Sequence, residues 1–500
     1  MPFFFKAKKL DISSGRSAFA VFHSDEAARL GMRREDRVAL HFDGTRVDAI
    51  ADYSDREVSR GEVGLFREIW QEKHIRDGEI IEVEFIHRPP SVEAIKKKLL
   101  GKPLTYNELY SIVSDIVKGR LGDIETTYFV ATGFSQPWSI KELCWLAQAM
   151  ADTGEKVKLA GTVIDIHSIG GMPGNRTTML TAPIAACLGL TIPKTSSRAI
   201  TSPSGVADTM ECLAKVDLDI SDIKRIAEKV GATLAWGGSL NMAPADDHII
   251  RMSYPLAMEP YSKMVVSIMA KKAAMGIKYF VIEMPVGPTA KVHSQDTARQ
   301  LERRFRAVGE HFGMKVKVVK LREVEPCGHG VGPALEARDV MRVLQRKDNR
   351  SHTLERTALR LVAYAAHLTG KYSFRRALKL ARAALENGEA WRKMQEIIKA
   401  QGPNMKPSID AEEIISSKVL THDIKATKRG YVTAVNNYAI TDIARNLGAP
   451  VYKQAGLYLH KRYRDKVHHG EVLFTLFAES EERMDLALHA LRKVDVFEIS

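Results

Sequence analysis

The sequence has 500 residues, of which 45% are hydrophobic and 27% are charged; this is a globular composition in a chain too long for one core. Two to four domains are therefore expected. Its 74 Lys and Arg against 61 Asp and Glu give a formal charge of +13, which suits anionic ligands. No basic stripe interleaved with aromatic residues is present, so nucleic acid is not an expected partner. No uninterrupted apolar run of about 18 residues occurs either, so the sequence predicts no membrane span.

Short strand-like segments separated by turns fill residues 1–88, so a small β-rich N-terminal domain is predicted there. Helical periodicity follows over residues 92–150. Ser91 is a candidate cap for the first of these helices, and Thr105 with Glu108 forms the pattern of a capping box for the second.

Strands alternate with helices from Gly161 onward, which predicts a large α/β domain with a mainly parallel sheet over 161–240 plus 275–420. The expected strands are GTVIDI, TIPKTS, GATLAW, KYFVIEMPVG and MKVKVVKL. A helical insert over 246–274 interrupts the alternation. Residues 421–500 alternate short strands with two helices and are predicted to form a C-terminal α+β lobe. The predicted fold class is thus multidomain α/β.

The cysteines number four and are scattered, with no spacing typical of a zinc site. Reduced thiols in a cytoplasmic protein are the simpler interpretation. The sequence therefore predicts no metal site. The four are Cys144, Cys187, Cys212 and Cys327.

The segment DIHSIGGMPGNRTT, residues 165–178, lies between a predicted strand and a helix expected to begin near Thr177. Its glycines let backbone amides approach an anion, and a helix N-terminus offers unpaired N–H groups. Ser168 and Thr178 add hydroxyl donors, and Arg176 adds a positive charge. The spacing matches neither the Walker nor the dinucleotide template. A phosphate site is one interpretation, and a turn that needs glycine only for its geometry is the other.

Two further loops favour the phosphate interpretation. KTSSRAITSPSG, residues 194–205, and VGPTAKV, residues 286–292, each follow a predicted strand. Loops at the carboxyl ends of neighbouring parallel strands face one crevice. The hydroxyl-rich second loop and Lys291 of the third are therefore expected at the same sheet edge as the glycine-rich segment.

These loops, together with VSIMAKKAAMG, VGPALEARDVMRVL and the segment from Gly430 to Ser480, resemble the thymidine phosphorylase superfamily. Within it, the chain is similar to the AMP phosphorylases and related putative thymidine phosphorylases, a branch with an N-terminal extension. The resemblance covers nearly the whole chain. It implies that residues 92–150 and 246–274 form one helical domain.

The resemblance implies a pentosyltransferase that uses inorganic phosphate as co-substrate, with no metal and no organic cofactor. AMP and phosphate would give adenine and ribose 1,5-bisphosphate. The alternatives are a thymidine or other pyrimidine nucleoside phosphorylase, which releases the base and (deoxy)ribose 1-phosphate, and a catalytically weak nucleotide-binding paralogue. A phosphoribosyltransferase would need magnesium and acidic ligands, for which Asp165 and Asp208 are the candidates. A cytoplasmic homodimer or larger homo-oligomer, with neither nucleic acid nor membrane as partner, is also implied.

The same resemblance implies the site residues. The catalytic candidates are Glu259, as proton donor to the leaving base, and His167, which matches the histidine of the Lys-His-Ser motif of the thymidine enzymes. The phosphate-binding candidates are Ser168, Gly171 and Thr178. The nucleotide-binding candidates are Gly171, Ser197, Arg198, Ala199, Ile200, Thr201, Ser202, Val206, Arg251, Ser267, Lys271 and Lys291.

Three positions depart from the family pattern. Ile166 stands where the thymidine enzymes carry the lysine of that motif. Val206 stands where the nucleotide branch usually has threonine, so one hydroxyl donor is lost. Glu259 stands where the branch has aspartate, so the acid is longer by one methylene. The weak-paralogue alternative depends on the last two departures.

Overall fold

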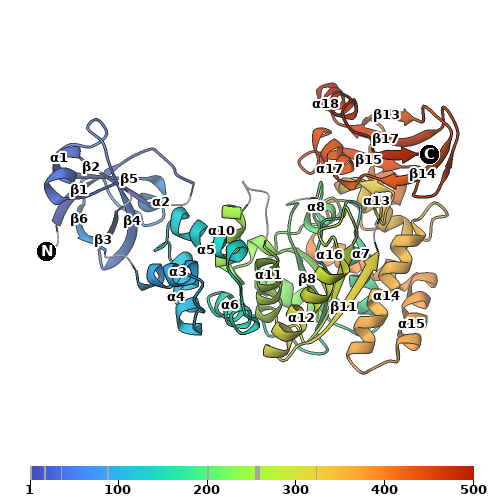
Figure 1. The fold of residues 1–500 in the computed structure, drawn as a ribbon, viewed down its shortest axis with the longest axis horizontal. Coiled ribbons are helices and arrows are strands. Elements are labelled where there is room, and N and C mark those ends of the chain that lie inside the picture. Colours follow the sequence, from blue (N-terminus) through green and yellow to red (C-terminus); the bar gives the residue numbers. More distant parts are fainter. Residues whose placement is uncertain are drawn as a thin grey trace. The chain divides into compact units, whose positions relative to one another are not determined.

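The computed structural model describes residues 3–15, 18–34, 36–86, 89–199, 202–253, 260–322 and 324–500, and it divides into two compact units (Figure 1). The first unit comprises Met1–Thr153 and Pro244–Lys263. The second comprises Gly154–Ala243 and Met264–Ser500. No helix among the described residues is both long and apolar enough to cross a membrane.

The first unit begins with a closed β-barrel in the strand order β1-β5-β2-β4-β3-β6. Phe5, Phe22 and Leu40 are among the side chains that fill its interior. Closing the sheet on itself pairs the strand edges that an open sheet would expose. The elements are β1 (Phe3–Lys9), β2 (Phe19–Phe22), α1 (Ser24–Leu30), β3 (Arg37–Phe42), β4 (Thr45–Tyr53), β5 (Glu62–Leu65), α2 (Arg67–Trp70) and β6 (Ile80–Phe85).

Helices make up the rest of the first unit: α3 (Pro90–Leu99), α4 (Tyr106–Val117), α5 (Asp123–Ser135), α6 (Ile140–Asp152) and α10 (Pro244–Ser253). The capping box predicted for α4 is confirmed, because Glu108 Oε2 accepts from the Thr105 amide at 2.8 Å and the Thr105 hydroxyl accepts from the Glu108 amide at 3.4 Å. The cap predicted at Ser91 is wrong. Helix α3 already begins at Pro90, the residue before Ser91, so Ser91 lies inside the helix. The missing N–H of Pro90 suits the first helical position.

Parallel strands form the sheet of the second unit, as the sequence predicts. The order β11-β10-β7 is one parallel set and β8-β9 another, and the parallel bridge Val163–Thr191 connects β7 to β8. The strands are β7 (Ile164–Ser168), β8 (Ile192–Ser196), β9 (Ala232–Trp236), β10 (Tyr279–Val286) and β11 (Lys315–Arg322).

Helices cover this sheet, and α14 packs against α7 as well as against β7, β10 and β11. Residues 177–185 of α7 are all buried, so this helix is an inner element that fixes the turn before it. The helices are α7 (Thr177–Cys187), α8 (Val206–Glu211), α9 (Ile220–Val230), α11 (Tyr261–Ala274), α12 (Gln295–His311), α13 (Pro333–Leu344), α14 (His352–Leu368), α15 (Phe374–Glu386) and α16 (Glu389–Gln401), and short 3₁₀ turns lie at Gly237–Ser239 and Ala411–Ile414.

The division between the units falls inside α11, which differs from the expectation that 246–274 belongs wholly to the helical domain. Residues from Met264 onward, including Ser267 and Lys271, lie in the unit that holds the parallel sheet. Two contacts explain this placement. Lys272 pairs with Asp165 on β7 at 2.7 Å, and the Ala274 carbonyl accepts from the Val157 amide at 2.7 Å.

The C-terminal segment alternates short strands with two helices, as predicted. One of its sheets has the order β12-β15-β17-β13, and the other has the order β16-β14-β18. Strand β12 precedes α13, so the lobe takes one strand from outside residues 421–500. The elements are β12 (Gly330–Val331), β13 (Leu420–Lys425), β14 (Gly430–Val435), α17 (Asn437–Asn446), β15 (Gly456–Leu459), β16 (Lys466–Val467), β17 (Val472–Ala478), α18 (Glu481–Leu491) and β18 (Phe497–Ile499).

Candidate active site

The glycine-rich turn leaves β7 after Ser168 and enters α7 at Thr177, as predicted. Gly170 and Gly171 have φ angles of 81° and 89°, in the left-handed region that favours glycine. A Cβ on Gly171 would lie 2.8 Å from Cβ of Lys291. The first and third loops identified from the sequence therefore touch at the carboxyl edge of the sheet.

This contact allows a matched pair of variants to be compared. Gly170→Ala and Gly171→Ala carry the same left-handed strain, about 1–2 kcal/mol, but only the second places a methyl group against Lys291. We expect both to lower thermal stability slightly, and only Gly171→Ala to raise the KM for phosphate or nucleotide strongly. Steady-state kinetics with each substrate varied in turn measures the difference. Equal kinetic effects of the two variants would remove the contact with Lys291 from the explanation.

Glu283 of β10 holds the turn in place. Its carboxylate accepts hydrogen bonds from the Thr177 hydroxyl at 2.7 Å and from the side-chain amide of Asn175 at 3.0 Å. It also accepts from the hydroxyl of Ser168, which lies opposite it in the pairing of β7 with β10. Burial raises the pKa of Glu283, although these three donors favour its ionised form. Glu283 was not among the residues predicted from the sequence. The available signal was an acid within the otherwise apolar strand FVIEMPV.

His167, next to Ser168 on β7, lies in a strongly cationic environment. Burial lowers the pKa of its imidazole well below 6.5, and Lys194, Lys272, Lys271 and Lys291 lower the pKa further, in that order. The imidazole is therefore neutral at physiological pH. Two candidates that are distant in sequence, Lys271 and Lys291, thus lie near enough to His167 to influence it electrostatically.

Asp165 is the anion at the base of this cluster. Its carboxylate pairs with Lys272 at 2.7 Å and with Lys194 at 3.2 Å, and all three side chains are buried. Lys194 and Lys272 were not among the residues singled out as ligands. The signal for Lys194 was positional, because it is a charged residue inside the predicted strand TIPKTS.

The carboxylates that a magnesium-dependent phosphoribosyltransferase would need are already engaged. Asp165 binds two lysines, and Asp208 accepts from the backbone amides of Ala199 at 2.7 Å and Gly205 at 2.9 Å. Within the described ranges, no group of three or more His, Cys, Asp and Glu side chains is arranged to hold a metal ion.

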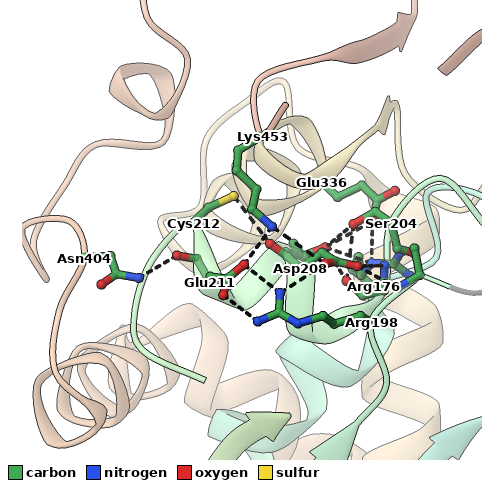
Figure 2. Close-up of polar contacts among 12 residues, drawn as sticks. Arg176, Arg198, Ser204, Asp208, Glu211, Cys212, Glu336, Asn404 and Lys453 are labelled. Atoms are coloured by element: carbon green, nitrogen blue, oxygen red, sulfur yellow. Dashed lines mark hydrogen bonds and ion pairs between the residues drawn. The ribbon is translucent and has the colours of Figure 1, made fainter. Parts of the chain in front are cut away.

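Arg176 is engaged by other protein groups, although the sequence suggested it as a positive charge for an anion site. Its guanidinium is buried, forms an ion pair with Glu336 and donates to the Thr209 hydroxyl at 3.1 Å and to the Ser204 carbonyl (Figure 2). Burial raises the pKa of Glu336 to about 7, while Arg176 is the strongest influence in the opposite direction. Arg176 therefore fixes both the glycine-rich turn and the hydroxyl-rich second loop to α13.

The second loop is held by an ion-pair cluster of Arg198, Glu211, Asp208 and Lys453 (Figure 2). Arg198 makes two hydrogen bonds of 2.7 Å to Glu211, and Lys453 of the C-terminal lobe pairs with the same carboxylate at 2.7 Å. The pKa of Glu211 is lowered to about 2, and the hydrogen bonds from Arg198 are the largest cause. Burial opposes this shift, and Lys453 adds to it. The Arg198 guanidinium also lies 4.8 Å from the Trp236 ring, so it is oriented toward α8 and β9.

The described residues of this loop pack tightly against the start of α8. A Cβ on Gly205 would lie 2.5 Å from the Ser197 carbonyl oxygen, and the Ser202 hydroxyl donates to the Ser204 carbonyl at 2.6 Å. Val206 is the first residue of α8 and is half-buried. Ile200 and Thr201 lie outside the described residues.

The remaining candidates lie on three helices. Thr178 is buried in the first turn of α7, and Ser267 lies about one helical turn before Lys271 on α11. Arg251 lies on α10 of the first unit, where its guanidinium is 3.3 Å from His248 Nδ1. Glu259 lies outside the described residues.

Three family models match the chain in order. Residues 92–154 match the helical bundle domain of a glycosyl transferase family, residues 160–391 its α/β domain, and residues 431–497 the C-terminal domain of pyrimidine nucleoside phosphorylases. In the solved structures, anthranilate phosphoribosyltransferase from Thermus thermophilus superposes with a TM-score of 0.53 at 18% identity, over 62% of this chain and 99% of that one. At this identity the likeness concerns the fold alone.

The matched domains define a pentosyltransferase with a helical bundle and a large α/β domain. Among curated relatives, AMP phosphorylase from Thermococcus kodakarensis is 41% identical over 99% of this chain and 97% of its own length. AMP phosphorylase 1 from Archaeoglobus fulgidus is 39% identical over 97% and 95%, respectively. The chain belongs to the AMP phosphorylase branch of the thymidine phosphorylase superfamily, which confirms the resemblance noted in the sequence.

Proposed function

We propose that this chain catalyses the reversible phosphorolysis of AMP, giving adenine and ribose 1,5-bisphosphate. The observation that carries the proposal is the identity of 39–41% to AMP phosphorylases over 97–99% of the chain. The same relatives favour this reaction over the pyrimidine nucleoside alternative. The meeting of the glycine-rich turn with the Lys291 loop at one sheet edge supports it on physical grounds, because both reactants are anionic.

In the proposed reaction, an oxygen of phosphate bonds to C1′ of the ribose as the bond from C1′ to N9 of adenine breaks. The electron pair of that bond leaves with the base, which takes a proton from Glu259. Ser168, Gly171 and Thr178 bind the phosphate. The nucleotide is bound by the residues from Ser197 to Ser202 and by Val206, Arg251, Ser267, Lys271 and Lys291.

A cluster of lysines around a neutral histidine suits this chemistry. Phosphate and a nucleotide 5′-phosphate repel one another, and nearby lysines offset that repulsion. Holding the two reactants in line supplies much of the rate enhancement expected of such an enzyme. Neutral hydroxyl and imidazole donors orient the phosphate without adding further charge.

The test is a base-release assay with purified protein, phosphate and a panel of AMP, CMP, UMP, thymidine and uridine. We expect phosphate-dependent release of adenine from AMP, with ribose 1,5-bisphosphate as the second product by mass spectrometry. Cleavage of thymidine or uridine alone would instead establish the nucleoside phosphorylase alternative.

The weak-paralogue alternative is tested separately, by substitutions at Val206 and Glu259. The double variant Val206→Thr, Glu259→Asp restores both residues typical of the branch. If wild type binds AMP without releasing adenine and the double variant gains turnover, the native chain is the paralogue. Turnover by wild type excludes it.

We further propose a homodimer or larger homo-oligomer in the cytoplasm, with 92–150 and the part of the insert that precedes Met264 acting as the helical domain. This rests on the family resemblance. Light scattering coupled to size-exclusion chromatography tests the oligomeric state, and a monomer at micromolar concentration would contradict it.

A further inference from the structure

The Nζ atom of Lys194 lies among three acceptors. It donates to Asp165 Oδ2 at 3.4 Å and to the Ile166 carbonyl oxygen at 2.9 Å, and it lies 3.3 Å from His167 Nδ1. A lysine ammonium has three hydrogens to donate and no lone pair. Each of its hydrogens therefore has one acceptor, and the Nδ1 atom of His167 must be the unprotonated nitrogen that accepts.

We propose that Lys194 is a positioning residue: its ammonium donates to Nδ1 of His167 and keeps the neutral imidazole in the tautomer that carries its proton on Nε2. The remaining N–H is then a fixed donor for a substrate oxygen. The tautomer follows from the contacts of the protonated lysine, whereas its effect on turnover rests on the proposed function.

Ile166 stands where the thymidine enzymes carry a lysine, and Lys194 brings a lysine to the same histidine from another strand. The thymidine enzymes carry a lysine immediately before the histidine, whereas the Ile166 side chain is fully buried in this chain. In this chain a positive charge reaches the histidine from the neighbouring strand, because Lys194 on β8 extends to the backbone carbonyl of Ile166. Asp165 pairs with that ammonium in a buried site and is shared with Lys272.

The groups around His167 explain why its imidazole stays neutral. Lys194 faces it from β8, Lys271 and Lys272 from α11, and Lys291 from the third loop. Asp165 lies on the same strand, while β10 contributes the Phe280 ring, with centroids 6.3 Å apart, and the buried Glu283. Four lysines against two carboxyl groups disfavour an imidazolium, so His167 serves as a hydrogen-bond donor and not as a cation.

A pH dependence follows from the lysine. Burial lowers the pKa of Lys194 to about 8, although Asp165 opposes the shift. Above that pH the amine has a lone pair and can accept from an Nδ1–H, so the tautomer is no longer enforced. The fixed Nε2–H is therefore present below about pH 8 and is lost as the pH rises through that value.

The decisive measurement is ¹⁵N NMR of histidine-labelled full-length protein without substrate, with the His167 signal identified by its loss in His167→Gln. We expect unprotonated Nδ1 and protonated Nε2 in wild type at pH 7, and a mixture of tautomers in Lys194→Met or in wild type above about pH 8. Lys194→Met should also lower kcat about tenfold or more and leave the KM for AMP nearly unchanged. It should remove the fall in kcat that we expect in wild type above about pH 8, where the fixed Nε2–H is lost. Lys272 still pairs with Asp165 in this variant, so no buried carboxylate is left without a cation.

A matched control uses another buried lysine. Lys98 of the first unit pairs with Glu142 at 2.7 Å, and the double variant Lys98→Met, Glu142→Gln should leave the His167 signals unchanged. A wild-type proton on Nδ1, or an unchanged His167 tautomer in Lys194→Met, would overturn the proposal even if adenine is released. Should Lys194→Met fail to fold, the pH titration of wild type decides the question. A Lys194-dependent Nε2–H tautomer without adenine release would instead contradict the proposed function alone.

Discussion

Replacing Glu259 by glutamine is expected to lower kcat for AMP by about 10²–10⁴-fold, the range typical of losing a general acid. The amide keeps the shape and much of the hydrogen bonding of the carboxylic acid, but it cannot transfer a proton to the departing adenine. The dissociation constant for AMP should therefore change little. Stopped-flow or quenched-flow release of adenine measures the first quantity, and calorimetric titration measures the second.

Glu228→Gln on α9 is the control, because it removes an exposed carboxylate that is not among the candidate residues. It should match wild type in both measurements. If Glu259→Gln also matches wild type in turnover, Glu259 is not the proton donor and the acid must be sought elsewhere.

Replacing Arg176 by methionine is expected to destabilise the second unit by about 3–5 kcal/mol. Arg176 is the cation paired with the buried Glu336 and also bridges the Thr209 hydroxyl and the Ser204 carbonyl. Its loss leaves a buried carboxylate without its cation. Differential scanning calorimetry, followed as the shift of the corresponding transition, measures the effect.

The loss should depend on pH in a defined direction. The pKa of Glu336 is already about 7 in the folded protein, above its ordinary value of 4.5, and without Arg176 it rises further. A raised folded-state pKa gives a contribution to stability that is full below the unfolded pKa and disappears as pH rises through the folded pKa. The deficit of Arg176→Met should therefore be greater at pH 8 than at pH 6.

The double variant Arg176→Met, Glu336→Met removes both charges and should recover a large part of the lost stability. A single variant no less stable than the double one would show that the unpaired carboxylate is not the cause. Catalysis is expected to suffer in both, because Arg176 fixes the two loops that meet near α13.

The sequence alone determined those features that depend on local pattern. Apolar runs alternating with helical periodicity predicted the parallel strands, and the Thr105–Glu108 spacing predicted a capping box that the structure contains. The three loops were recognised because parallel strands must present their carboxyl ends at one edge. The family was recognised from ordered motifs in those loops.

Only the tertiary structure decided how the charged side chains are paired. Arg176 looked like an anion ligand in sequence, yet Glu336, 160 positions later, takes its guanidinium into the interior. Lys194 looked like an incidental charge in a strand, yet it meets Asp165 and His167 because β8 lies beside β7. An ionic group in a low-dielectric interior must find a partner, and that partner is chosen by the packing of distant segments, which local sequence patterns do not encode.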